Sequence, residues 1–162
     1  MRRLAVLIAV PVLIVLASPS AFAAKPDREP IANYPLTLDP SLCGFFVHIG
    51  FPDQNEYATI WTHPDGTVVD HINGTLVAKV TNANTLASMT VNISGPAINV
   101  THPDGSYDVK LRGPILIWGV IGPLPSLALV HGQIDLHGDS PFSQGVVTKL
   151  TGAVDDVCAE LS

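Results

Sequence analysis

Apolar and polar residues alternate with a period of two along most of the chain. In the segment 130–137, Val, Gly, Ile and Leu occupy every second position, and His, Gln, Asp and His stand between them. This period is typical of β-strands with one buried face. No stretch after Ser41 shows a sustained period of 3.6 residues, so the pattern predicts an all-β domain over residues 41–162.

A repeated turn motif separates some of the alternating segments. Its two copies are His63, Pro64, Asp65 and Gly66, and His102, Pro103, Asp104 and Gly105. Proline fixes φ, and glycine accepts the positive φ that a type I turn with a following bulge requires. Both copies are therefore predicted to close hairpins, and the histidines have a structural role as the polar residues that begin each turn.

Five glycines stand midway between successive turns, in phase with the apolar residues: Gly74, Gly95, Gly113, Gly132 and Gly152. Asn73-Gly74 is a common hairpin dipeptide, but the alternation continues unchanged through it. Long strands should therefore run through these inward-facing glycines, which allow a sheet to bend strongly. With the segments 44–52 and 57–62, we expect about seven strands in an antiparallel meander, closed or nearly closed as a small barrel or two-layer sandwich.

The glycines also predict the register of the strands. The expected neighbours are Gly74 with Gly95, Gly95 with Gly113, Gly113 with Gly132, and Gly132 with Gly152. A three-residue loop that pairs His102 with Ser106 gives the second of these registers independently. The same registers place Asp135 opposite Lys110 on one side and opposite Lys149 on the other.

The first residues match a cleavable signal peptide. A basic start precedes the apolar run 4–17, and Ala21-Phe22-Ala23 is a small-residue cleavage signal. The alternative is an uncleaved membrane anchor, but a run interrupted by Pro11 is shorter than the roughly 20 residues that a bilayer requires. We expect residues 1–23 to be removed. The product should have no stable membrane anchor and should be extracellular, free or associated with the cell envelope.

Residues 24–40 contain four prolines among charged and small residues, which predicts an extended lead-in before the domain. The net charge of the whole chain is −6, and residues 1–23 contain two of the eight basic residues and no acidic one. The mature chain therefore carries a net charge of −8. This balance argues against a nucleic-acid partner, whose phosphates require a basic surface.

The chain has two cysteines, Cys43 and Cys158, one near each end of the expected domain. In an exported protein this arrangement predicts a disulfide, and two free or metal-binding thiols are the alternative. The chain-entropy model assigns about 4 to 5 kcal/mol to a cross-link that closes so long a loop.

Four short segments carry a resemblance to known proteins: Cys43-Gly44-Phe45, Asn92-Ile93-Ser94-Gly95-Pro96, Asp104-Gly105-Ser106 and Val154-Asp155-Asp156-Val157-Cys158-Ala159. Together they resemble a group of uncharacterised small secreted β-rich proteins of actinobacteria. The resemblance covers most of the chain after residue 40. It implies an actinobacterial source and assigns no catalytic residue.

One strand face carries candidate metal ligands. Asp135 and His137 lie two residues apart with His131 on the same face, a spacing that zinc sites use when a neighbouring strand adds a third ligand. No second His or acidic cluster completes such a site. We therefore expect a solvated face with ion pairs to the lysines, and no metal or cofactor.

Asp70 has the phase of Val68 and Ile72, which directs it to the inner side of its strand. A buried carboxylate is costly unless it is paired, and it is often functional. A position near a wet strand end is the other interpretation. Both remain open at the level of the sequence.

No motif predicts catalysis. Gly138-Asp139-Ser140-Pro141 resembles the nucleophile segment of chymotrypsin-like proteases, but the mature chain is too short for their two barrels, and a turn is the simpler interpretation. The leading hypothesis is a non-catalytic extracellular binding or surface-interaction protein, with Trp118, Ile98 and Val100 exposed as an apolar partner site. The alternative is a carrier of a small apolar ligand inside a lipocalin-like barrel. A secreted hydrolase is third.

Overall fold

The computed structural model describes residues 27–162, so the predicted signal peptide lies outside the described residues. Residues 27–162 are built almost entirely of β-strands, with two one-turn helices. In chain order the elements are β1 (Asp27–Ile31), β2 (Leu36–Leu38), α1 (Pro40–Cys43), β3 (Val47–Thr62), β4 (Val68–Asn82), β5 (Ser88–Asn92), β6 (Ala97–Thr101), β7 (Tyr107–Trp118), β8 (Leu127–Gly138), β9 (Val146–Asp156) and α2 (Val157–Glu160). The all-β prediction is confirmed. No helix within residues 27–162 is long and apolar enough to cross a membrane.

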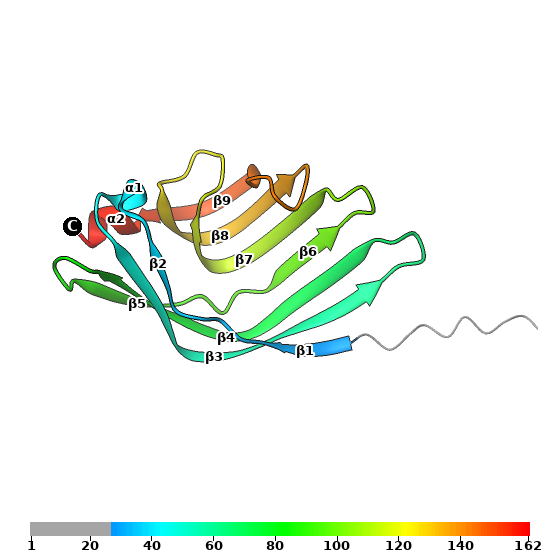
Figure 1. Cartoon of the computed structure of the whole chain (residues 1–162), viewed down its shortest axis with the longest axis horizontal. Coiled ribbons are helices and arrows are strands. Elements are labelled where there is room, and N and C mark those ends of the chain that lie inside the picture. The colour runs from blue at the N-terminus through cyan, green and yellow to red at the C-terminus, as the bar shows by residue number, and fades with distance from the viewer. Residues whose placement is uncertain (1–26) are drawn as a thin grey trace, which may run out of the picture.

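The strands form one antiparallel sheet in the order β1-β3-β4-β6-β7-β8-β9 (Figure 1). Two short strands lie off this path, where β2 pairs with β3 and β5 pairs with β4. Among the described strands, β1 and β9 do not pair with each other, so the sheet is not closed. The predicted antiparallel meander is confirmed, and of its two predicted forms the open sheet is consistent with the two-layer sandwich and not with a closed barrel.

Three strand predictions need correction. The predicted lead-in is extended, but it is part of the sheet, because β1 and β2 pair with β3. The segments 44–52 and 57–62 belong to one long strand, β3, with a register shift between Gly50 and Asp53. The strand expected to run through Gly95 is divided into β5 and β6.

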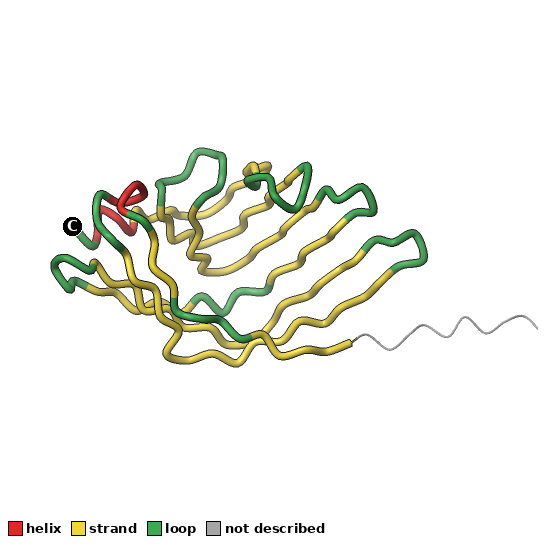
Figure 2. The backbone as a smooth tube through the Cα atoms, viewed as in Figure 1, coloured by secondary structure: helices red, strands yellow, loops and turns green. Residues whose placement is uncertain are grey.

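Both predicted hairpin turns are present, at the same end of the sheet (Figure 2). The amide of His63 donates to the carbonyl of Thr67 at 2.8 Å, and the amide of His102 donates to the carbonyl of Ser106 at 2.9 Å. The turn glycines have φ of +89° at Gly66 and +87° at Gly105. These are the bonds and dihedral angles of a type I turn with a glycine bulge, as predicted.

The predicted registers are present where the strands pair, because Ile72 pairs with Ala97 and Ala97 pairs with Leu111 as the first two registers require. Of the four expected glycine pairs, however, two form and two do not. Gly132 pairs with Gly113 on one side and with Gly152 on the other. Gly74 instead pairs with Glu56, and Gly95 lies in the irregular segment between β5 and β6. A β-carbon on Gly132 would overlap the carbonyl oxygen of Thr151, so the strands approach too closely for any side chain there.

The long strands β7, β8 and β9 curve along their length (Figure 1), and Gly113, Gly132 and Gly152 pair with one another near the middle of these strands. We call this row of glycines the fold line. On one side of this line the sheet is continuous from β4 through β6 to β7. On the other side it separates into two layers, β2 to β5 below and the ends of β7 and β8 above (Figure 1). The sheet separates because β5 pairs only with β4, and the irregular segment 93–96 carries the chain on to β6.

Two apolar clusters fill the molecule. The first lies between the two layers and under both helices, and its largest fully buried members are Val47, Ile49, Val80, Leu127 and Val157. The second lies on the other face of β7 and β8, where Val120 and Leu124 of the following loop pack against it. Both faces of β8 are therefore covered over residues 127–130, all of which are buried.

The predicted disulfide is present and connects α1 to α2. The Cα atoms of Cys43 and Cys158 lie 5.1 Å apart and are separated by 115 residues in the sequence. Asn82, which is 2 % exposed, supports the same corner because its Nδ2 donates to the carbonyl of Leu161 at 2.9 Å. The C-terminal helix is thus held by one covalent bond and one buried hydrogen bond.

Candidate functional site

One face of the sheet carries the candidate site. Directly paired residues of an antiparallel ladder lie on the same face. Ala58, Ile72, Ala97, Leu111 and Ile134 pair in this way across five strands. We call the face that carries them the inner face, and the opposite side the outer face.

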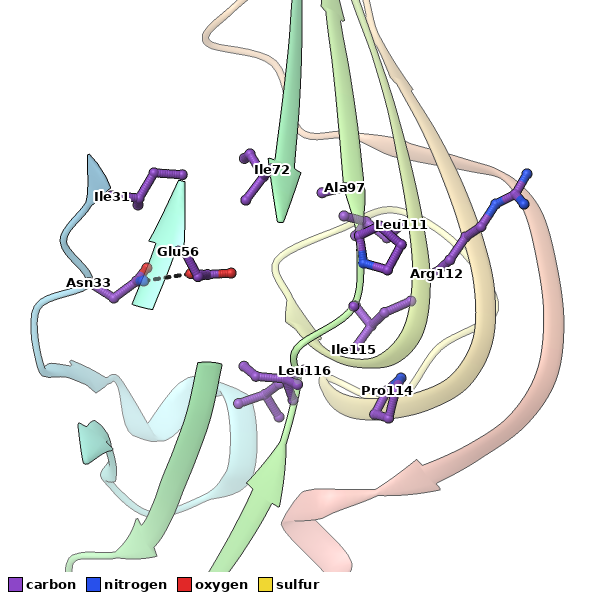
Figure 3. Close-up of a pocket in the computed structure, with 13 residues that line it drawn as sticks. Ile31, Asn33, Glu56, Ile72, Ala97, Leu111, Arg112, Pro114, Ile115 and Leu116 are labelled. Atoms are coloured by element: carbon purple, nitrogen blue, oxygen red, sulfur yellow. Dashed lines mark hydrogen bonds between the residues drawn. The ribbon is translucent and has the colours of Figure 1, made fainter. Parts of the chain in front are cut away.

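A first hollow of about 230 Å³ lies on the inner face where the sheet begins to separate into layers (Figure 3). The residues that line it are Ile31, Asn33, Glu56, Ile72, Ile93, Gly95, Pro96, Ala97, Leu111, Arg112, Pro114, Ile115 and Leu116. Most are apolar, and they come from both sides of the bend. The hollow therefore results from the bend and from the absence of side chains at the fold line.

Glu56 places a carboxylate in this hollow although the residue is only 8 % exposed. Asn33 donates from Nδ2 to Oε2 of Glu56 at 2.8 Å. Asn33 is itself held by Gln54, which accepts from its amide at 2.7 Å and donates to its carbonyl at 3.1 Å. In Figure 3 the Glu56 carboxylate points into the hollow, whereas the guanidinium of Arg112 points away from it.

A second hollow of about 330 Å³ contains Asp70, the residue whose inward phase was predicted. Its lining residues are Asp70, Asn99, Thr101, Gly105, Tyr107, Val109 and Pro141. The Oδ1 atom of Asp70 is buried and has no hydrogen-bond partner among the described residues. This hollow is more polar than the first, and it lies toward the predicted hairpin turns.

The two hollows adjoin along three strands. Each strand contributes one residue to the first hollow and the next inner-face residue to the second: Ile72 and Asp70 on β4, Ala97 and Asn99 on β6, and Leu111 and Val109 on β7. Residues two apart on a strand are separated by about 7 Å. The inner face is therefore apolar at Ile72, Ala97 and Leu111, and it becomes more polar two residues further along the same strands, where Asp70 and Asn99 lie.

The outer face carries a cluster of titratable side chains that the sequence did not bring together. Asp108 accepts from His102 at 2.9 Å through one carboxylate oxygen and from His137 at 2.9 Å through the other. These bonds, first from His102 and then from His137, lower the pKa of Asp108. The bond to Asp108 raises the pKa of His137. The three side chains are about two-fifths exposed, at 37 to 42 %.

The predicted pairing of Asp135 on β8 with lysines of the neighbouring strands is present in the register, but the side chains do not form ion pairs. Asp135 pairs with Lys110 and Lys149. Nevertheless, the ion pairs within residues 27–162 all involve histidines, and Asp135 accepts instead from Gln133 at 2.8 Å. His131 bonds Asp155 at 3.0 Å. In this described part of the chain, no group of three His, Cys, Asp or Glu side chains could hold a metal ion.

The predicted apolar surface patch is incomplete. Trp118 is half-buried and packs against the first apolar cluster, because the second layer covers that side of β7. Ile98 and Val100 lie on the outer face, and both are half-buried. The expectation of an exposed Trp118 is therefore wrong.

The polar groups that line the two hollows include carboxylates, amides and the hydroxyls of Thr101 and Tyr107. The Tyr107 hydroxyl donates to the carbonyl of Ser143 at 3.1 Å. Comparison with family models, with curated proteins and with solved structures gave no match.

Proposed function

We propose that this protein binds a small, largely apolar molecule on its inner face, outside the cell and without catalysis. The first hollow carries this proposal, because its walls are mostly apolar and a single buried carboxylate points into it. Sites for small molecules are typically concave and apolar with a few polar groups that fix the orientation of the ligand. The hollows, at about 230 and 330 Å³, suit a small ligand.

Two observations support an extracellular role. The Cys43–Cys158 disulfide belongs to oxidising compartments such as the cell exterior. The first 23 residues have the basic start, the apolar run and the small residues of a signal peptide. Export followed by oxidation accounts for both.

Ligand binding is favoured over a protein partner because the expected partner surface lacks its largest side chain. Trp118 packs into the core instead of lying beside Ile98 and Val100. It is favoured over hydrolysis because, among the described residues, the hydroxyls of Thr101 and Tyr107 that line the second hollow do not form a hydrogen bond with a carboxylate that could act as a base.

The decisive experiment is native mass spectrometry of the protein purified from culture medium. We expect a non-covalent adduct of one small molecule per chain, which denaturation releases. A ligand-free protein that forms a stable oligomer would overturn the proposal and favour a protein partner.

A filling variant locates the site. Ala97 lines the first hollow and is 9 % exposed, so Ala97→Leu should occupy ligand volume and abolish the adduct. Ala153→Leu on β9 adds the same atoms at an exposed position and serves as the control. If the Ala97→Leu protein folds and retains the adduct, the ligand does not lie in the first hollow.

A further inference from the structure

The basic residues of the strands lie on one face of the sheet. The lysines and arginines of residues 27–162 all lie in strands: Arg28, Lys79, Lys110, Arg112 and Lys149. Each of them is out of phase with the inner-face residues of its own strand. Lys110, for example, pairs with Ile98 and Asp135 on the outer face, and Arg112 pairs with Gln133. No basic side chain of the described strands is therefore directed to the inner face.

The inner face carries carboxylates instead. Glu29 on β1 pairs with Ala58 on β3. Ala58 lies two residues from Glu56 on the same face of β3. Ile60 on β3 pairs with Asp27 on β1 and with Asp70 on β4, so two carboxylates flank this apolar residue. Four acidic residues thus lie along β1, β3 and β4, on the same face as the two hollows.

Two of these carboxylates are removed from water without full compensation by hydrogen bonds or positive charge. Glu56 is buried, and Asn33 donates a hydrogen bond to its Oε2 atom. Asp70 has a buried oxygen with no partner among the described residues. Removing a carboxylate from water is unfavourable unless a positive charge or hydrogen-bond donors compensate for it. A cationic ligand would supply that compensation for Asp70 Oδ1 and would add to the hydrogen bond that Asn33 gives Glu56.

We propose that the ligand is a small organic amine, with its ammonium group beside Asp70 or Glu56 and its hydrocarbon part on Ile72, Ala97 and Leu111. This inference rests on the proposed function and names the chemical class of its ligand. The carboxylates provide the charge complement, and the apolar residues between them accept the hydrocarbon chain.

The test compares probes that share one hydrocarbon chain and differ in the head group: octylamine, octanol and octanoate. Isothermal titration of the full mature protein should give the tightest binding for octylamine and none for octanoate. Equal binding of octanol and octylamine would overturn the amine assignment and leave the apolar site intact. Failure of all three probes to bind would overturn the amine proposal and the proposed function together.

Variants separate charge from shape. Asp70→Asn and Glu56→Gln keep the side-chain volume, and at least one of them should weaken octylamine binding about tenfold, as the loss of a charged hydrogen bond implies. Glu160→Gln removes the same charge from an exposed position on α2 and should leave binding unchanged. Affinity that is unchanged in both folded inner-face variants would contradict the proposal.

Discussion

Asp108 is the residue on which the outer-face cluster depends. Its two carboxylate oxygens accept from two histidines that come from different elements, the turn after β6 and the end of β8. His137 also lies 3.5 Å from Asp139. The cluster thus connects a hairpin turn to a neighbouring strand, and its strength depends on the charges of its members.

The pH dependence of unfolding should reflect this cluster. The pKa of Asp108 is lowered, so its contribution is present above the unfolded pKa and is lost as pH falls through the folded value. The pKa of His137 is raised, so its contribution is complete below the unfolded pKa and is lost as pH rises through the folded value. The window lies between about pH 4 and pH 6.5.

Asp108→Asn should therefore lower the midpoint of thermal unfolding more at about pH 5 than at about pH 9. Both proteins are measured at the two pH values in the same salt. The effect should be modest, because the side chains are about two-fifths exposed. A difference that is the same at both pH values would show that the charges of the cluster do not contribute.

Asn82 is a buried polar residue that we expect to contribute to the stability of the fold. It donates to the carbonyl of Leu161 and accepts from the amide of Asn84 at 2.8 Å. Asn82→Ala should reduce the free energy of unfolding by about 1 to 3 kcal/mol, because it leaves a buried backbone group unpaired. Denaturant unfolding measures the change, and the exposed Asn84→Ala is the control.

At the scale of residues, the sequence identified one of the two carboxylates that line the hollows and missed the other. Asp70 was recognised because the alternation of β4 continues through it. Glu56 was missed because the register shift between Gly50 and Asp53 changes the phase of β3, so Val47 and Glu56 face the same side at an odd spacing. A bulge of this kind interrupts the alternation of apolar and polar residues, so the face of a residue beyond it cannot be extrapolated from the residues before it.

Among the elements, the long strands and their registers were predictable, and the short ones were not. Alternation and turn chemistry define β4 and β7 to β9 over many residues. β1 and β2 are short and contain or adjoin prolines, so their local sequence resembles a linker even though pairing with β3 holds them. The break at Gly95 depends on the close approach of Arg112, which is a tertiary contact.

Gly132 tests the role of the fold line. A β-carbon there would overlap the carbonyl oxygen of Thr151, so Gly132→Ala must move β8 away from β9. We expect the variant to unfold at a much lower temperature or to remain unfolded, with a cost of at least about 3 kcal/mol. Gly50→Ala, where a β-carbon meets nothing within 4 Å, should change stability little. Similar midpoints for the two variants would show that the bend tolerates side chains.

For the whole molecule, the disulfide replaces the closure that the sheet lacks. It joins two helices that cap the layered end of the fold, while β1 and β9 remain unpaired with each other. The sequence predicted the covalent tie together with a closed or nearly closed small barrel or a two-layer sandwich, and it did not distinguish the two forms. It could not show that strands bent at glycines separate into layers, because that depends on packing between distant segments.

Reduction should therefore lower the unfolding midpoint considerably. A cross-link over 115 residues restricts the unfolded chain by about 4 to 5 kcal/mol. We expect a decrease of roughly 10 °C or more in a thermal scan with reductant. The Cys43→Ser, Cys158→Ser double variant should match the reduced protein and should not respond to reductant. An unchanged midpoint would mean that the bond does not contribute to stability.

The sheet edges formed by β1 and β9 have a consequence for solubility at high concentration. An unpaired edge strand offers amide and carbonyl groups to a strand of another molecule, and this is how sheets begin to form fibres. On β1, Pro30 has no amide hydrogen, and charged residues precede it. On β9, Lys149 carries a charge, and Gly152, with φ of +99°, interrupts the flat ladder that a second strand would need. The inner face of this open sheet remains accessible, while the edge strands β1 and β9 carry features that disfavour pairing with the strands of further copies.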